Sequence, residues 1–565
     1  MNSNRTGIST SLFGMLLGGV LLFANSQAVA QNAGETSAEV AGLHLSYLGP
    51  GGCYLCHAFR EKASEFQSNA YCALDEYTIW EEQDVHRHAY EQLLSKSAQK
   101  MAERLGWKPE DTVKREECLS CHTGLSTHLP ELPAATVAAP AAAFQRAGVS
   151  CEACHGPASL WIDRHWKPVD WRGFTTERKL HEYGFRDIRS ASGKAQLCYS
   201  CHIGDPEQNR VVTHAMYAAG HPPLPGIEIS RFEDAMPAHW RQVREKPEYE
   251  YRDEFVRENY SGTMDLQKTL PRFRASVIGG LTAYRQSLAL MSGTATATQH
   301  PDATAVWPEL AVFDCQSCHH ALRSPAVRQT FGYGQRIPGR PMEFQWPGAL
   351  LEVSLQAIAD REQLRDQLAD GRKRLLQALN HRPFGAPEEL AEIIGQGQRP
   401  AEGSLLHALD LCIDAVAQTD FERDEAIAML KRLCFLGPEA YPDFHSARQL
   451  AWTVQTLLAE LQLSYPELRG VENLEDPLAT AQVTRDLDRF RMFRQERQDL
   501  QSRSDAEWNS VIELALPVRD ADAGLAESLP QTLSAARNFD PFAFAEYLRG
   551  IPERHSELFD GAADR

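Results

Sequence analysis

Five copies of one short cysteine–histidine motif stand out in this chain. In each copy two residues separate a pair of cysteines, and a histidine directly follows the second cysteine. This C-x-x-C-H spacing is that of c-type haem attachment, because two thiols bond the two vinyl groups of one porphyrin while the histidine binds the iron. The predicted attachment residues are Cys53, Cys56, Cys118, Cys121, Cys151, Cys154, Cys198, Cys201, Cys315 and Cys318. The predicted proximal iron ligands are His57, His122, His155, His202 and His319. The sequence therefore predicts five covalently attached haem c groups.

Other uses of paired cysteines fit this spacing less well. A disulfide framework would suit an exported chain with 13 cysteines, but the five motifs already take ten of them. Zinc sites and thioredoxin-like pairs need no histidine directly after every second cysteine. Of the remaining cysteines, Cys412 and Cys434 lie in apolar helical runs and are predicted to be buried thiols, with a disulfide between them as the alternative. We assign no role to Cys72.

The chain also holds more histidines than the motifs use. Residues 44–345 contain 16 of the 20 histidines. Their use matters, because an iron with one histidine keeps an open position for chemistry, whereas an iron with two histidines mainly transfers electrons. The choice between these two functions therefore depends on the histidines outside the motifs.

Four short strings around these histidines resemble a known family. They are residues 148–157 (GVSCEACHGP), 213–222 (THAMYAAGHP), 236–240 (MPAHW) and the histidine-containing segment 80–90. With them, about residues 44–350 resemble the cytochrome c-554 family of multihaem cytochromes, which is related in haem packing to hydroxylamine oxidoreductase and pentahaem nitrite reductase. The resemblance implies that the matching histidines are distal iron ligands: His86, His165, His214, His221 and His239.

Several of these assignments have alternatives. His86 competes with His88 and is favoured because the family's segment has the pattern Asp-x-His-x-x-Ala. His165 is otherwise a surface histidine, and His239 otherwise packs against its neighbours. His128 and His320 are the further candidates for distal iron ligands.

A helix is predicted to end between His214 and His221. The two are seven residues apart, but Gly220 and Pro222 indicate that a helix ends between them, and the resemblance implies that they serve different haems. The family cytochrome has four motifs and this chain has five, so the family does not assign every haem.

The first 30 residues are predicted to be a cleaved signal peptide. Arg5 precedes the uncharged apolar run 12–23, and residues 28–30 (AVA) have the small-x-small pattern of a cleavage site. An uncleaved anchor is the alternative. No later segment is apolar for long enough to cross a membrane. We expect a periplasmic protein, which agrees with haem attachment outside the cytoplasm.

The elements that position the motifs are expected to be helices. Residues 44–345 form the predicted pentahaem domain, with short helices, little regular strand, a surface connection at 131–143 and a loop at 292–304. Residues 346–565 form a predicted all-α domain, whose helical stripes are interpreted as core faces: Leu351, Leu355, Ile358, Leu364, Leu368, Leu450, Val454, Leu457 and Leu461. The predicted fold class is therefore mainly α.

The charge of the chain narrows the choice of partner. With 57 basic and 76 acidic residues, the formal net charge is −19, which disfavours nucleic acid as a partner and suits redox partner proteins. We expect an electron carrier rather than a catalyst. The alternatives are a haem oxidoreductase acting on a small nitrogen or sulfur compound at one open haem, and an electron-transfer subunit of a larger respiratory complex.

Overall fold

The chain folds mainly into helices, as predicted. The computed structural model describes residues 44–58, 74–126, 132, 136–137, 146–167, 171, 173–240, 270–297, 306–319, 337–397, 400–419, 421–464 and 541–554. Within these ranges the strands are β1 (Ser46–Tyr47) and β2 (Thr136–Val137), which pair in parallel. The predicted signal peptide, Cys72, His128 and His320 lie outside the described residues.

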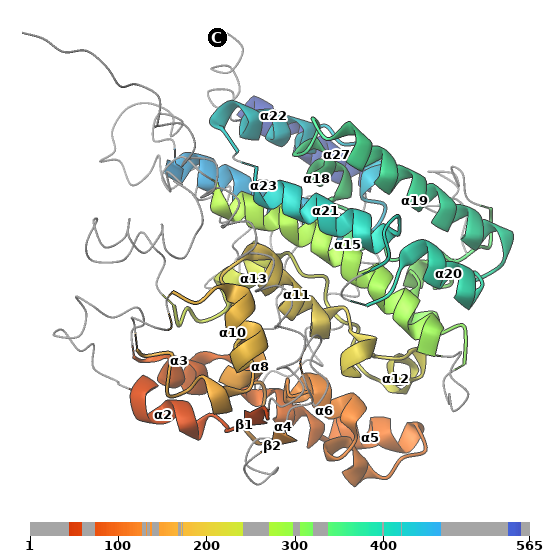
Figure 1. The fold of residues 1–565 in the computed structure, drawn as a ribbon. Coiled ribbons are helices and arrows are strands. Elements are labelled where there is room, and N and C mark those ends of the chain that lie inside the picture. Colours follow the sequence, from red (N-terminus) through yellow and green to blue (C-terminus); the bar gives the residue numbers. More distant parts are fainter. Residues whose placement is uncertain are drawn as a thin grey trace, which may run out of the picture.

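The N-terminal half consists of short helices joined by turns, drawn in red to yellow in Figure 1. The α-helices are α2 (Gly51–His57), α3 (Glu76–Gln83), α4 (Ala89–Leu93), α5 (Lys96–Arg104), α6 (Glu116–His122), α8 (Cys151–His155), α10 (Thr176–Tyr183), α11 (Ala191–His202), α12 (His214–Ala219) and α13 (Ile229–Ala235). The 3-10 turns of this half are η2 (Val85–His88), η3 (Pro109–Val113), η4 (Ala158–Leu160) and η5 (Pro206–Gln208). Two more, η7 (Leu310–Val312) and η8 (Cys315–Ser317), follow later in the chain, after residue 297.

The C-terminal half is a bundle of longer helices above the motif region in Figure 1. Its elements are α15 (Pro271–Ala297), α17 (Gln345–Gly348), α18 (Leu351–Gln356), α19 (Glu362–His381), α20 (Pro387–Ile394), α21 (Leu405–Ala417), α22 (Arg423–Cys434), η9 (Pro438–Ala440), α23 (Phe444–Ser464) and α27 (Pro541–Arg554).

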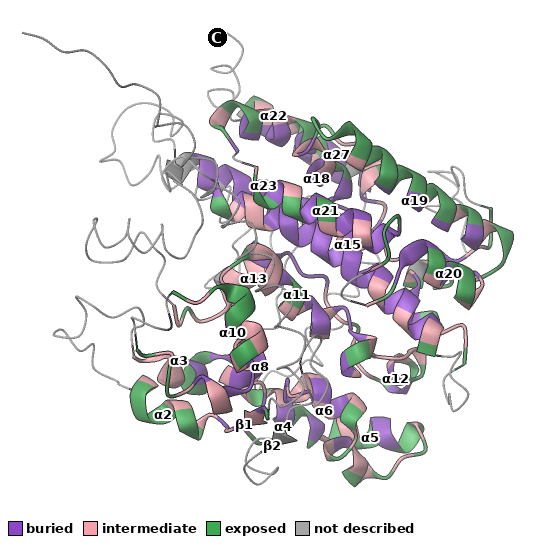
Figure 2. Ribbon diagram, in the orientation of Figure 1, coloured by how far each residue is buried: buried purple, intermediate pink, exposed green. Residues whose placement is uncertain are grey.

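Helix α15 joins the two halves through one hydrophobic core. It contacts α11 and α13 on the motif side and α17, α18, α20, α21 and α23 in the bundle. Figure 2 shows α15 and α23 buried along most of their length. The largest cluster of buried apolar side chains extends from Ala195 to Ile551. This core continues across residues 345 and 346, where the sequence places a domain boundary; that boundary stays a prediction.

The predicted helical stripes of the bundle are core faces. Leu450, Val454, Leu457 and Leu461 of α23 are at most 1% exposed, and Leu351, Ile358 and Leu368 are equally buried. Leu355 and Leu364 are partly buried against the same core. Cys412 and Cys434 are buried and form no disulfide with each other, so the alternative of a disulfide between them is wrong.

The predicted loop at 292–304 is wrong for residues 292–297, which are the last turns of α15. Small side chains suit this position because the helix is packed closely on several sides. The Ser292 hydroxyl, for example, is fully buried and donates a hydrogen bond to the Gly395 carbonyl, at 2.7 Å. A run of small residues thus indicated close packing here. Residues 298–304 lie outside the described part of the chain.

The motif region has no comparable core of its own among the described residues. It contains three small clusters, centred on Leu45 and Tyr47, on Tyr90 and Leu93, and on Trp161 and Trp171. The described helices include none that is long and apolar enough to cross a membrane.

The start of α23 gives a prediction for the pH dependence of stability. Burial, then the charge of Arg448, lowers the pKa of His445 to about 3, whereas an unfolded histidine titrates near 6.5. The unfolded chain therefore takes up the proton first as the pH falls, and folding is weakened progressively between about pH 6.5 and pH 3. At pH 5 the loss is about 1–2 kcal/mol. We expect the thermal midpoint to fall less between pH 7 and pH 5 in His445→Gln than in the wild type; an equal fall would contradict the assignment.

Candidate haem sites

Helical turns present the two cysteines and the histidine of each motif together. The helices α2, α6, α8 and α11 end on the motif histidines His57, His122, His155 and His202. In the fifth motif, η8 begins at Cys315 and His319 follows it, with its backbone N–H bonded to the Cys315 carbonyl. Residues three and four apart share one face of a helix. Both thiols and the imidazole are thus placed to reach a single porphyrin.

Three of the five motif histidines face a predicted distal histidine across a similar gap. The ring centres of His57 and His165 are 6.2 Å apart, with planes inclined by 20°. Those of His214 and His319 are also 6.2 Å apart, at 26°. The rings of His86 and His202 are 6.4 Å apart and perpendicular, at 89°.

This spacing fits an iron between the rings. A metal–imidazole bond of about 2 Å on each side, with about 1 Å from each nitrogen to its ring centre, separates two axial rings by roughly 6 Å. The planes of axial imidazoles can rotate about the metal–nitrogen bond, so both the parallel and the perpendicular pairs are compatible with it. The described residues contain no group of three or more His, Cys, Asp or Glu side chains that could hold a metal ion.

The other two motif histidines also lie near predicted distal ligands. Burial, and after it the charge of His239, lowers the pKa of His155 to about 4. Burial lowers the pKa of His221, and the charge of His122 contributes to that shift. Three predicted distal histidines therefore face a motif histidine, and the other two are linked to a different motif histidine each by the effect of charge on a pKa.

Hydrogen bonds at Nδ1 leave the other ring nitrogen available for iron in several of these rings. Nδ1 of His165 lies 2.7 Å from the Ile162 carbonyl, and Nδ1 of His122 lies 2.7 Å from the Ala89 carbonyl. Nδ1 of His221 is 2.8 Å from the Pro222 carbonyl. Since a carbonyl accepts, each Nδ1 carries the proton. Metal-binding histidines are commonly oriented by such a bond.

Two carboxylates orient histidines in the same way. Nδ1 of His57 lies 2.8 Å from Glu76, and this hydrogen bond raises the pKa of His57. Nδ1 of His86 lies 2.9 Å from Asp84, whose carboxylate also accepts the His86 backbone N–H. Burial lowers the pKa of His86, but its interactions with Asp84 outweigh burial and raise it. Asp84 was part of the family string, whereas nothing in the sequence pointed to Glu76.

The structure distinguishes His86 from its competitor His88. His86 faces His202, whereas His88 is exposed and bonds Glu91 one turn along the chain.

The pair His214 and His221 is separated as the sequence indicated: α12 ends at Ala219, and Gly220 follows in a left-handed conformation. The chain can therefore direct His214 toward the fifth motif and His221 toward the second.

A comparison with known families covers the first three motifs. Residues 52–156 match the family described as cytochrome c554 and c-prime. This segment is similar to the cytochrome c-554 family. No curated protein and no solved structure matches the chain. The match supports a c-type cytochrome with covalently bound haem and a role in electron transfer with redox partners.

Within the cytochrome c-554 segment, Glu152 ties the first motif to the third. It lies between Cys151 and Cys154 and is 1% exposed. Its carboxylate accepts backbone N–H groups from Leu48 at 3.0 Å, Gly49 at 2.6 Å and Ala158 at 2.7 Å. Leu48 and Gly49 directly precede α2, which carries the first motif. This role was not predicted from the sequence.

The chain after α10 supports the third motif from the other side. The Arg186 backbone N–H donates to the His155 carbonyl at 2.9 Å, and the Arg186 side chain donates to the Ala153 carbonyl at 3.2 Å. Gly156 has φ of +83°, and a Cβ there would lie 2.1 Å from the Gly184 carbonyl oxygen, so only glycine fits.

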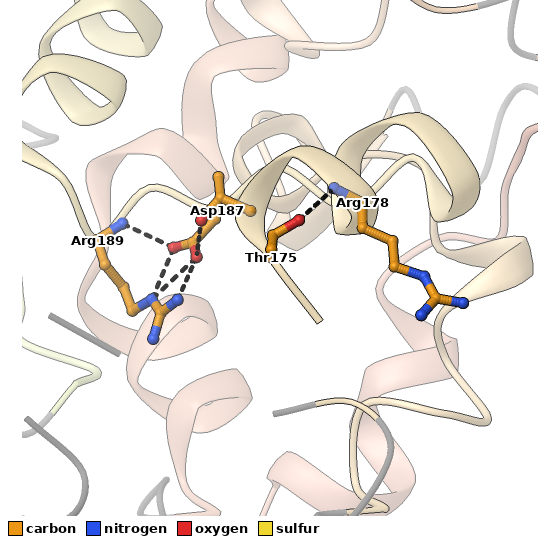
Figure 3. A network of polar contacts seen from close by, with 5 residues as sticks. Thr175, Arg178, Asp187 and Arg189 are labelled. Atoms are coloured by element: carbon orange, nitrogen blue, oxygen red, sulfur yellow. Dashed lines mark hydrogen bonds and ion pairs between the residues drawn. The ribbon is translucent and has the colours of Figure 1, made fainter. Parts of the chain in front are cut away.

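A polar network fixes this supporting segment (Figure 3). The Thr175 hydroxyl accepts the Arg178 backbone N–H at 3.1 Å and so begins α10. The Asp187 carboxylate accepts the Arg189 Nε–H at 2.8 Å and the Thr176 hydroxyl at 3.1 Å. The contacts fix the start of α10 and tie it to the segment after the helix, which packs on His155 through Arg186.

Contacts between the cysteines show which motifs are neighbours. Cys53 and Cys151 lie close enough for each thiol to shift the pKa of the other, and so do Cys121 and Cys201. Burial, and next the charge of Cys154, raises the pKa of Cys198 to about 12. The first motif is therefore next to the third, the second next to the fourth, and the third next to the fourth.

Proposed function

We propose that this protein is an exported pentahaem electron carrier in which each iron is bound by two histidines. The proposed axial pairs are His57 with His165, His122 with His221, His155 with His239, His202 with His86, and His319 with His214. The observation that carries the proposal is the set of three histidine pairs with ring centres 6.2–6.4 Å apart. The proximity of the other two pairs supports it.

The cysteine contacts support a linear order of the haems. Contacts join the first motif to the third, the third to the fourth and the fourth to the second. Tyr217 extends this series: burial raises its pKa most, followed by the charge of Cys315 and, with a smaller contribution, that of Cys121. Its ring therefore lies near both the fifth and the second motif. The proposed order is first, third, fourth, second, fifth.

The ends of this series suit exchange of electrons with partner proteins. Cys56 of the first motif and Cys315 and Cys318 of the fifth motif are exposed, whereas the cysteines of the three inner motifs are buried or half-buried. With a net charge of −19, the protein would attract partners with basic surfaces. We propose that electrons enter at one end and leave at the other, in the periplasm, after cleavage of the signal peptide.

The test is electron paramagnetic resonance of the fully oxidised protein, integrated against a pyridine haemochrome count. We expect five haems per chain, all low-spin, because two imidazoles per iron give a strong ligand field. Fewer than five haems would contradict the predicted loading. A high-spin signal near one haem equivalent would contradict the fully bis-histidine proposal and would support the oxidoreductase alternative.

A further inference from the structure

A buried arginine at the start of α23 has no acidic partner of its own. Arg448 is 4% exposed, and the hydrogen bonds of its guanidinium among the described residues are to a carbonyl and an imidazole and include no carboxylate. Its Nη2 donates to the Gly226 carbonyl at 3.0 Å and to Nδ1 of His445 at 3.2 Å, and both acceptors are neutral. Its Nε has no hydrogen-bond partner. A buried charge left in this state is costly, so a further partner is expected.

The nearest acidic residue does not supply that partner. Asp443 lies close enough for its charge to act on Arg448. Its carboxylate, however, accepts the backbone N–H groups of His445 and Ser446 and the Ser446 hydroxyl. It is therefore used to begin α23 and leaves the guanidinium without a direct anionic contact.

A second unpartnered donor lies beside the arginine. Gln449 is 3% exposed, and its Nε2 has no hydrogen-bond partner. Both side chains converge on Gly226, where a Cβ would lie 3.3 Å from Gln449 Nε2 and 3.4 Å from Arg448 Nη2. The Trp346 ring lies on a third side, since the same Cβ would be 3.2 Å from its Cδ2, so a side chain at Gly226 would crowd both donors. A guanidinium and an amide directed to one buried place form a site for a carboxylate.

The site lies close to the haem motifs, although α23 is far from them in sequence. The Arg448 guanidinium stands over the Trp452 ring, at 4.8 Å. The Trp452 ring contacts Phe232, with centres 5.9 Å apart, and Phe232 contacts the motif histidine His202, at 6.3 Å. On another side, the charge of Asp443 contributes to the raised pKa of Cys315, which belongs to the fifth motif.

We propose that Arg448 and Gln449 bind the carboxylate of a haem propionate, from the fourth or the fifth haem. Every haem carries two propionates, each of which is a carboxylate. The inference rests on the proposed haem loading. It gives the C-terminal bundle a role: its buried cation stabilises the reduced form of one haem, because reduction adds negative charge nearby.

The test is a redox titration of the full-length, haem-loaded Arg448→Gln variant. We expect the midpoint potential of one haem to fall, with at least a tenfold change in its redox equilibrium constant, which is about 59 mV for one electron. Arg448→Lys keeps the charge and should retain most of the wild-type potential. The matched control is Arg432→Gln, which removes an exposed arginine that donates to Gln356. It should leave every potential unchanged.

Two further measurements identify the anion. Infrared difference spectra between the oxidised and reduced protein should show a propionate carboxylate band that moves in Arg448→Gln. Adding acetate to that variant or to the wild type should change no potential. A potential or band that follows the acetate concentration would assign the site to a free carboxylate and overturn the propionate assignment.

The redox titration can also overturn the inference. Unchanged potentials in a folded Arg448→Gln protein with five haems would overturn the inference. If that variant fails to fold, the Gln449→Leu variant is titrated in its place. A fall in the midpoint potential of one haem, smaller than the fall expected for Arg448→Gln, supports the site. Unchanged midpoint potentials overturn it. A wild-type count below five haems would instead contradict the proposed function, so the two failures are distinguishable.

Discussion

Replacing His86 with alanine should convert one haem of the five from low-spin to high-spin. His86 faces His202, the histidine of the fourth motif, with ring centres 6.4 Å apart. The Nδ1 atom of His86 is hydrogen-bonded to the Asp84 carboxylate. Alanine has no donor atom, so the iron would keep one histidine and an open position. The spin change follows because a single imidazole gives a weaker ligand field than two.

The measurement is electron paramagnetic resonance with spin integration, together with carbon monoxide binding to the reduced protein. We expect one haem equivalent of high-spin signal and one carbon monoxide per chain, with five haems still attached, because the attachment cysteines are untouched.

His88→Ala is the matched control. His88 is two residues away, exposed, and bonded to Glu91. It should leave all five haems low-spin. The assignment of His86 fails if His88→Ala opens an iron, or if His86→Ala leaves every iron low-spin.

Replacing Glu152 with glutamine should loosen the junction between the first and third motifs. The carboxylate accepts three backbone N–H groups while 1% exposed. Hydrogen bonds to a charged group contribute about 1.5–3 kcal/mol each. Glutamine keeps the size but turns one acceptor into a donor that faces backbone donors. We expect a loss of about 2–4 kcal/mol of stability.

Hydrogen exchange measured by mass spectrometry would localise the effect. The amides of Leu48 and Gly49 should exchange faster in Glu152→Gln, and the apparent thermal midpoint should fall. Glu103→Gln, at an exposed position of α5, is the control and should change neither. Unchanged exchange at Leu48 and Gly49 would show that Glu152 does not hold this segment.

The sequence alone determined the cofactor chemistry, because that chemistry is local. Two thiols and an imidazole must lie within five consecutive residues to reach one porphyrin, so the motif is visible without a fold. The leucine stripes of α23 were equally visible, since a helix repeats its buried face every three to four residues. The interpretation of small residues as a loop failed at residues 292–297, because small side chains mark close helix packing as well as loops.

Only the tertiary structure decided which groups meet. His165 lies ten residues after His155 of the third motif, which is the nearest motif in the sequence. In the structure, however, it faces His57 of the first motif. Glu152 reaches Leu48 and Gly49 across more than a hundred residues of chain, and Arg448 reaches Gly226 across more than two hundred. Spacing in the sequence carries no record of such contacts, because they depend on how separate helices pack. The sequence thus specified that haems are bound, and the packing specified which histidines and charges surround each of them.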